Sequence, residues 1–104
     1  MLAPVTGSPP RYGLFAEGTP EAVARAACAV DCALRANVHY AYARDLGQLG
    51  PLAAFAISGG APEAYLRGCA ALGQRLGDIK PTALHQATGW EHRFEGAWAE
   101  PISA

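Results

Sequence analysis

The chain has 104 residues and a formal net charge of −1, and 51% of its residues are hydrophobic while 16% are charged. This length suits a single domain with one modest core, and the composition excludes an intrinsically disordered chain. Binding to nucleic acid or to an anionic membrane surface requires clustered positive charge, so we expect neither partner.

The sequence carries no recognisable targeting or membrane segment. No apolar stretch is long enough to span a bilayer. The first ten residues lack the basic region and the apolar run of a signal peptide. We therefore expect a cytoplasmic location.

The chain divides into a leader, a domain and a tail. Residues 1–10 are rich in proline and predict a flexible leader. Residues 11–17 alternate well enough between apolar and other side chains to predict a short strand that opens the domain. We expect the domain to occupy residues 11–88, followed by an aromatic tail at residues 89–104.

A long helix is predicted directly after this strand. Thr19 is a favourable N-cap residue and Pro20 is suited to the first helical position. Apolar side chains recur at helical spacing from Val23 onward. The pattern can continue as far as Tyr42, with a bend near Asn37.

The second half of the domain predicts a strand, a helix and a strand. Residues 52–57 form a short apolar run closed by Ser-Gly-Gly, which is typical of a buried strand. Pro62 opens the next helix, whose expected apolar face comprises Tyr65, Leu66, Cys69, Leu72 and Leu76. Residues 82–86 predict a last short strand.

This order of elements predicts an α+β fold, with a small open sheet and two main helices covering one of its faces. In the tail, Trp90, Phe94 and Trp98 are spaced four residues apart. We expect them to pack back on the domain as a short amphipathic segment, and the alternative is a docking patch.

The three cysteines do not suggest a disulfide framework, because their number is odd. Cys28 and Cys32 share one helical face, and we expect them to be reduced thiols in the core. Together with His39 they could hold a metal ion, but no second pair of ligands follows at zinc spacing. We therefore assign no metal site.

Lys80 is the only lysine in the chain, since all other basic side chains except histidine are arginines. It follows the second predicted helix, in the segment Gly-Asp-Ile-Lys-Pro-Thr. Pro81 favours an extended backbone at Lys80, and an ammonium on a bendable arm suits a phosphate or carboxylate whose charge grows during a reaction. The alternative is an ordinary surface lysine in an arginine-rich composition.

Several short motifs resemble one known family. They are Asn37-x-x-Tyr40-x-x-x-Arg44, Leu49-Gly50-Pro51 before an apolar strand, Gly59-Gly60-Ala61 at the start of a helix, Lys80-Pro81 near the end, and Leu14-Phe15-Ala16-Glu17 in the first strand. In their order and spacing they resemble the C-terminal domain of the Gretchen Hagen acyl-acid amido synthetases. That family is the auxin-responsive branch of the adenylate-forming enzymes.

The resemblance implies a ligase reaction in two steps. ATP adenylates an acyl carboxylate with loss of pyrophosphate, and the amine of an amino acid then displaces AMP. It implies that Lys80 is the catalytic lysine that a small lid domain brings into the active site, where it stabilises the adenylation transition state. ATP and Mg²⁺ would be bound mainly by a large N-terminal domain, which these residues do not include.

Three further residues are candidates for binding substrate or nucleotide. Arg44 could reach a substrate carboxylate, although a salt bridge to Asp31 or Asp45 is favoured. Asp78 could orient Lys80 or occupy a turn. Thr82 follows the Lys80-Pro81 element and completes this set.

The sequence therefore supports two functions of different classes. The first is the lid domain of an acyl-acid amido synthetase, inactive alone and partnered by an adenylation domain in cis or in trans, with an acyl acid and an amino acid as substrates. The second is a stand-alone α+β module that binds a small ligand or forms a homodimer without catalysis.

Overall fold

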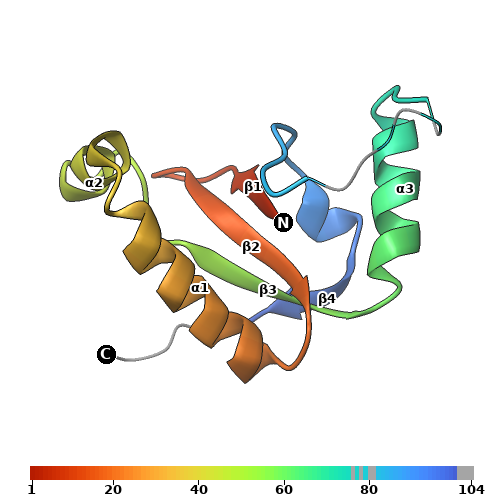
Figure 1. Ribbon diagram of the computed structural model, residues 1–104, viewed down its shortest axis with the longest axis horizontal. Coiled ribbons are helices and arrows are strands. Elements are labelled where there is room, and N and C mark those ends of the chain that lie inside the picture. The colour runs from red at the N-terminus through yellow and green to blue at the C-terminus, as the bar shows by residue number, and fades with distance from the viewer. Residues whose placement is uncertain (76, 78, 80–81, 101–104) are drawn as a thin grey trace.

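A computed structural model of the chain describes residues 1–75, 77, 79 and 82–100. Figure 1 shows the arrangement of its elements, which follow one another as β1 (Leu2–Val5), β2 (Arg11–Glu17), α1 (Pro20–Leu34), α2 (Val38–Asp45), β3 (Ala53–Gly59), α3 (Ala61–Ala71), the short 3₁₀ helix η2 (Trp90–His92) and β4 (Glu95–Trp98). The predicted α+β class and single domain are confirmed.

The four strands form one mixed sheet in the order β1-β2-β3-β4. The central pair β2 and β3 is parallel, with Phe15 opposite Phe55. The outer pairs, β1 with β2 and β3 with β4, are antiparallel. A parallel pair cannot be joined by a tight turn, so α1 and α2 together form the crossover between β2 and β3.

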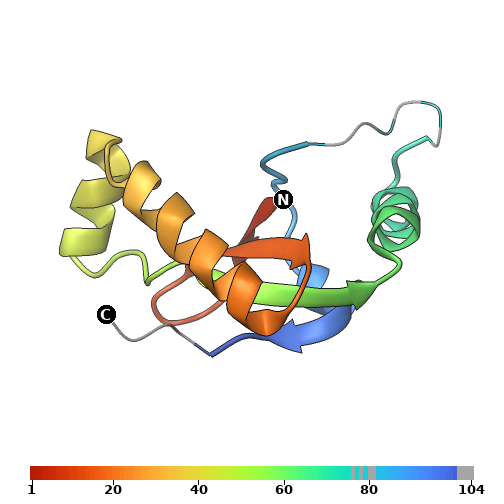
Figure 2. The same cartoon turned by 60° about the horizontal axis from the view of Figure 1, so that its bottom comes forward.

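The two main helices lie over opposite faces of the sheet, so the prediction that they cover one face was wrong. Ala54 and Ala56 of β3 pack with α1, whereas Phe55 and Ile57 belong to the cluster that contains residues of α3. Successive side chains of a strand point to opposite faces, so this alternation divides the core into two clusters. Figures 1 and 2 show α1 lying along the sheet, whereas α3 stands beside the end of the sheet at which β3 leads into it.

Helix α1 begins where the sequence predicts. The Thr19 hydroxyl accepts a hydrogen bond from the Ala22 backbone nitrogen at 3.2 Å, and Pro20 is the first helical residue. The buried face of α1 consists of Val23, Ala24 and Ala27. These small side chains let the helix approach the alanines of β3 closely.

The predicted long helix is interrupted rather than bent, so that part of the prediction was wrong. Helix α1 ends at Leu34, and Asn37 has an extended backbone with φ of −80° and ψ of 123°. Its side-chain oxygen accepts hydrogen bonds from the backbone nitrogens of His39 and Tyr40, at 2.9 and 3.2 Å. Asn37 therefore starts a separate helix, α2, because a capping asparagine competes with helix continuation.

The residues expected as leader and tail contribute to the sheet and to its core. Residues 2–5 form the edge strand β1, in which Ala3 is completely buried. In the expected aromatic tail, Trp90 is 0% exposed, Phe94 is buried and Trp98 lies in strand β4. All three rings pack against other aromatic side chains of the domain. Their spacing of four residues belongs to a 3₁₀ turn followed by a strand, and not to one continuous helix.

The last predicted strand is reduced to a single bridge. Leu84 pairs with Leu2 in a parallel bridge. The Leu2 backbone nitrogen donates to the Ala83 carbonyl at 2.7 Å, and the His85 backbone nitrogen donates to the Leu2 carbonyl at 2.8 Å. It covers part of the outer edge of β1.

A glycine on α3 makes room for the buried tryptophan. An added Cβ at Gly68 would lie 2.5 Å and 2.7 Å from two ring carbons of Trp90. Gly68→Ala should therefore destabilise the domain by about 1–3 kcal/mol through overpacking, although alanine favours helices.

Urea denaturation of this variant tests the contact. Gly59→Ala is the matched control, because an added Cβ there has nothing within 4 Å. Equal midpoints for the wild-type protein and Gly68→Ala would contradict the tight contact between α3 and Trp90.

Candidate functional site

An apolar hollow lies between α3 and the face of the sheet that carries the aromatic core. Its volume is about 600 Å³, within the range of roughly 300–1,000 Å³ typical of small-molecule sites. It is lined by Met1, Phe15, Ala16, Glu17, Ile57, Ala61, Pro62, Tyr65, Leu66, Ile79, Thr82 and Phe94. Nearly all of these side chains are apolar, so the hollow suits a largely apolar ligand group.

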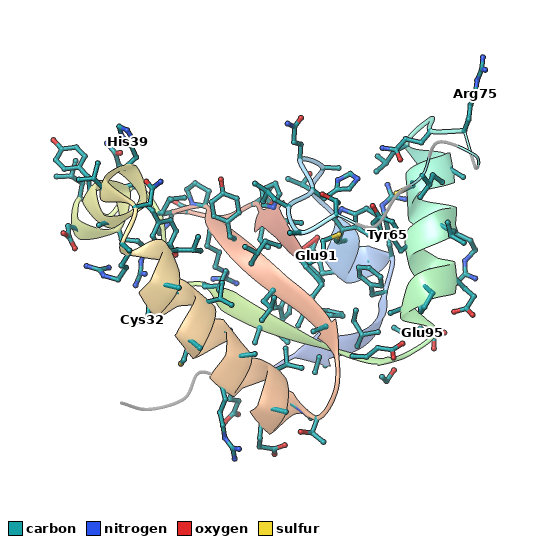
Figure 3. All side chains as sticks on the ribbon, in the orientation of Figure 1. Cys32, His39, Tyr65, Arg75, Glu91 and Glu95 are labelled. Atoms are coloured by element: carbon teal, nitrogen blue, oxygen red, sulfur yellow. The ribbon has the colours of Figure 1, made fainter. Side chains whose placement is uncertain are left out.

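The hollow exists because α3 is fixed at two points and stands apart from the sheet between them. At its start, the Glu17 carboxylate of β2 accepts a hydrogen bond from the Ala61 backbone nitrogen at 2.8 Å. Farther along, Gly68 contacts the Trp90 ring. Tyr65 lies between these two anchors in the sequence. Figure 3 shows its side chain extending from α3 toward the sheet.

A stack of aromatic rings stiffens one side of the hollow. The Trp90 ring lies between Tyr65 and Phe94, with centroid distances of 5.6 and 5.2 Å and interplanar angles of 19° and 27°. His85 meets the Trp90 ring edge-on at 5.0 Å. Burial and a hydrogen bond with Cys69 raise the pKa of Tyr65. The phenol therefore stays neutral at physiological pH.

Two buried donors in this region lack a hydrogen-bond partner within the described part of the chain. They are the Trp90 indole nitrogen and Nε of Arg93. The Arg93 guanidinium lies over the Trp90 ring, with its carbon 5.7 Å from the ring centroid. A cation over an aromatic face is favourable and accounts for the position of this arginine.

A second, more polar hollow adjoins the first. Its volume is about 650 Å³, and its lining comprises Tyr65, Gly73, Gln74, Arg75, Thr82, Leu84, His85 and Gln86. Tyr65 and Thr82 line both hollows. Sequence reasoning missed these two hollows, because they arise from the distance between α3 and the sheet, which no local pattern encodes.

The predicted site residues fall into different parts of the chain. Lys80 and Asp78 lie outside the described residues. Thr82 lines both hollows, and its hydroxyl donates a hydrogen bond to the Leu84 carbonyl at 3.0 Å. Ile79 also lines the apolar hollow.

Arg44 belongs to a separate structural cluster at the other end of the molecule. One guanidinium nitrogen donates to both carboxylate oxygens of Asp31 at 2.7 and 2.8 Å, and the Tyr40 hydroxyl donates to the same carboxylate. Asp45 pairs instead with Arg35 at 2.6 Å. Figure 1 places α2 and α3 at opposite ends of the domain, so the structure does not bring Arg44 together with Thr82.

The electrostatics of this cluster follow from its hydrogen bonds. Burial of Asp31 alone would raise its pKa, but the hydrogen bonds from Tyr40 and Arg44 outweigh that effect, and the pKa lies below its ordinary value. Burial, together with the hydrogen bond to Asp31, raises the pKa of Tyr40. The cluster therefore joins α1 to α2 through an ionised carboxylate and a neutral phenol.

The described residues offer no metal centre, since they contain no group of three or more histidine, cysteine, aspartate or glutamate side chains able to hold an ion. Cys28 and Cys32 are exposed on α1, so the prediction that they are core thiols was wrong. The reason is that the apolar face of α1 is built from Val23, Ala24 and Ala27, and both cysteines lie beyond it. Cys69 is buried.

Within the part of the chain that the structure describes, no helix has the length and apolar character needed to cross a membrane. Comparison with protein-family models, with curated proteins and with solved structures finds no match to this chain.

The ion pair of Asp31 predicts a pH-dependent contribution to stability. Because the folded pKa is lowered, the contribution is present above the unfolded pKa, near 4, and is lost as pH falls through the folded pKa. At pH 6 we expect Asp31→Asn to be less stable than the wild-type protein by about 1–2 kcal/mol.

Urea denaturation of both proteins between pH 2.5 and pH 7 checks this expectation, and the difference should shrink below about pH 4. Asp45→Asn is a suitable control, since its carboxylate is two-thirds exposed in an ion pair of small expected value. A difference that is constant over the whole pH range would contradict the role of the ionised carboxylate.

Proposed function

We propose that this chain is the C-terminal lid domain of an ATP-dependent acyl-acid amido synthetase. The complete enzyme joins an acyl carboxylate to an amino acid through an acyl adenylate, and Lys80 stabilises the adenylation transition state. The motifs that resemble the Gretchen Hagen family support this proposal. The lid is inactive alone, and its partner is an adenylation domain in cis or in trans.

One observation carries the proposal. Ile79 and Thr82, which flank Lys80 and Pro81 in sequence, both line the apolar hollow beside α3. The two described residues that flank the lysine in sequence therefore border a mainly apolar hollow that is large enough for a small molecule. An ammonium that acts beside such a surface interacts more strongly with a developing negative charge than it does in bulk water.

The chemistry assigned to the lysine is electrostatic. In the first step a carboxylate oxygen of the acyl acid attacks the α-phosphorus of ATP, a new P–O bond forms, and the bond to pyrophosphate breaks. Negative charge grows on the phosphoryl oxygens and on the leaving group, and the Lys80 ammonium stabilises it. In the second step the amine of the amino acid attacks the acyl carbonyl carbon, loses a proton and releases AMP.

The remaining motif residues fit a structural role that supports a lid. Asn37 caps α2, while Tyr40 and Arg44 bind Asp31 of α1. A lid that moves as a body needs rigid elements, and these contacts fix α2 on α1. ATP and Mg²⁺ would be bound mainly by the adenylation domain.

A second candidate function is a stand-alone module that binds a small ligand without catalysis. The volume and apolar lining of the hollow favour this reading on their own. It differs from the first in one consequence: an apolar ligand would bind the isolated chain, and ATP would not change its affinity.

The lysine is tested in the enzyme that unites this domain with its adenylation domain. Lys80→Ala should lower the rate of ATP–pyrophosphate exchange by about 10²–10³-fold, by analogy with the loss of an oxyanion-stabilising donor. Lys80→Arg should restore part of the rate, because it keeps the charge but changes the geometry.

Arg67→Ala provides the matched control, because it removes an exposed cation of α3 that lines neither hollow. The folded state of each variant is compared by circular dichroism. Pyrophosphate exchange that is unchanged in Lys80→Ala would exclude the catalytic assignment, and a wild-type enzyme without exchange would exclude the ligase itself.

A further inference from the structure

Two cysteines on α1 are exposed, although cysteine is among the residue types that are most often buried. Cys28 and Cys32 are four residues apart within one continuous helix, Pro20–Leu34. Side chains at this spacing lie one above the other on the same side of a helix. The two thiols therefore form a pair on the surface of the domain, which we call the α1 dithiol.

The spacing of the α1 dithiol suits a bridging ion better than a disulfide. Cβ atoms four residues apart in a helix are separated by about 5–6 Å. A disulfide needs roughly 3.5–4.5 Å between its Cβ atoms, so direct bonding of the two sulfur atoms would distort the helix. A metal ion between them adds two metal–sulfur bonds, each about 2.3 Å long in the case of zinc, and spans the wider separation.

The number and the softness of the ligands define the class of ion. Thiolates select soft ions, and zinc takes four ligands in structural sites and at least three from the protein in catalytic ones. No third ligand joins the α1 dithiol among the described residues, since these contain no group of three or more metal-binding side chains. Figure 3 shows His39, on α2, apart from Cys32. Cu(I) differs from zinc, because two thiolates in a linear arrangement satisfy it.

Two arginines flank the α1 dithiol on the same side of the helix. Arg25 precedes Cys28 by three residues, and Arg35 follows Cys32 by three. Binding of Cu(I) by two thiols releases two protons and leaves a complex with one net negative charge, which a cation one turn away stabilises. Arg35 is already paired with Asp45. Arg25 makes no ion pair with any residue that the structure describes, so its charge is available to the complex.

The acidic side chains of α1 do not compete with the thiols for this ion. Asp31 is adjacent to Cys32 in the sequence, but its carboxylate accepts hydrogen bonds from Tyr40 and Arg44. Glu21 precedes Cys28 by seven residues, which is about two turns of helix. Carboxylate oxygens also suit hard ions rather than soft ones. The two sulfur atoms are therefore the ligands.

We propose that the α1 dithiol binds one soft monovalent metal ion, Cu(I), between its two thiolate sulfur atoms. Both cysteines are exposed, so a thiol of another molecule can reach the ion and exchange it. This proposal does not depend on the ligase function, because neither cysteine lines the hollows beside α3.

Anaerobic titration of the reduced 104-residue chain with Cu(I), in competition with a chromophoric Cu(I) chelator, tests the proposal. We expect one ion for each chain. Cys28→Ser and Cys32→Ser should each lower the affinity at least about 100-fold, which is the lower end of the gain from linking two binding groups. Circular dichroism checks that each variant keeps its helices.

A variant that moves one thiol separates the spacing of the cysteines from their number. In the double variant Cys32→Ser, Ala33→Cys, the thiols of α1 are five residues apart and lie on different sides of the helix. Ala33 is exposed, so the change leaves the core intact. The affinity should fall as far as it does in Cys32→Ser alone.

Alkylation with iodoacetamide, followed by peptide mass spectrometry, identifies the ligands directly. Cys28 and Cys32 should be labelled in the free protein, and one equivalent of Cu(I) should protect both of them. Cys69 is buried and serves as the internal control, because it should stay unlabelled in both cases. Equal affinity of the wild-type chain and the moved-thiol variant, one ion shared by two chains, or unchanged labelling in the presence of Cu(I) would overturn the proposal.

Discussion

Small and large side chains alternate along β3, and this alternation determines how each helix packs on the sheet. Ala54 and Ala56 face α1, and Phe55 and Ile57 face the opposite side. Because the alanines are small, α1 lies close against the sheet with a face that is itself rich in alanine. The large side chains on the other face build an aromatic core, and α3 stands beyond it. The two faces of one strand thus carry different cores, and the apolar hollow beside α3 lies on the aromatic face.

The two ends of the molecule differ in the contacts that hold them. At one end, Asp31 gathers Tyr40 and Arg44 and fixes α2 on α1. At the other, Gly68 lets α3 contact the Trp90 ring closely, and the described neighbours of Lys80 line the hollow beside α3. The motif residues Tyr40 and Arg44 therefore have a structural role. The chemistry that we propose belongs to the lysine segment.

Local signals in the sequence predicted much of the fold. The Thr19 cap, the alternation in residues 11–17 and the apolar run before Ser58 predicted β2, the start of α1 and β3, because each depends on neighbouring residues alone. The faces covered by the helices, the edge strand β1 and the burial of Trp90 depend on contacts between distant segments. The break at Asn37 was recognised only as a bend, since the periodicity of apolar residues continues across it. The hollow could not be predicted, because its volume is set by the position of α3 relative to the sheet.

If this chain works as the lid of a larger enzyme, the polypeptide that carries it must be longer than the lid or must associate with a second chain, and its native size can be measured. Immunoblotting of source-cell extracts, with intact-mass confirmation of the purified product, measures that size. We expect a product several times longer than 104 residues, or a chain of this length that co-purifies with a separate adenylation domain. A product of only this length that purifies without a companion chain would contradict it and would favour the stand-alone module.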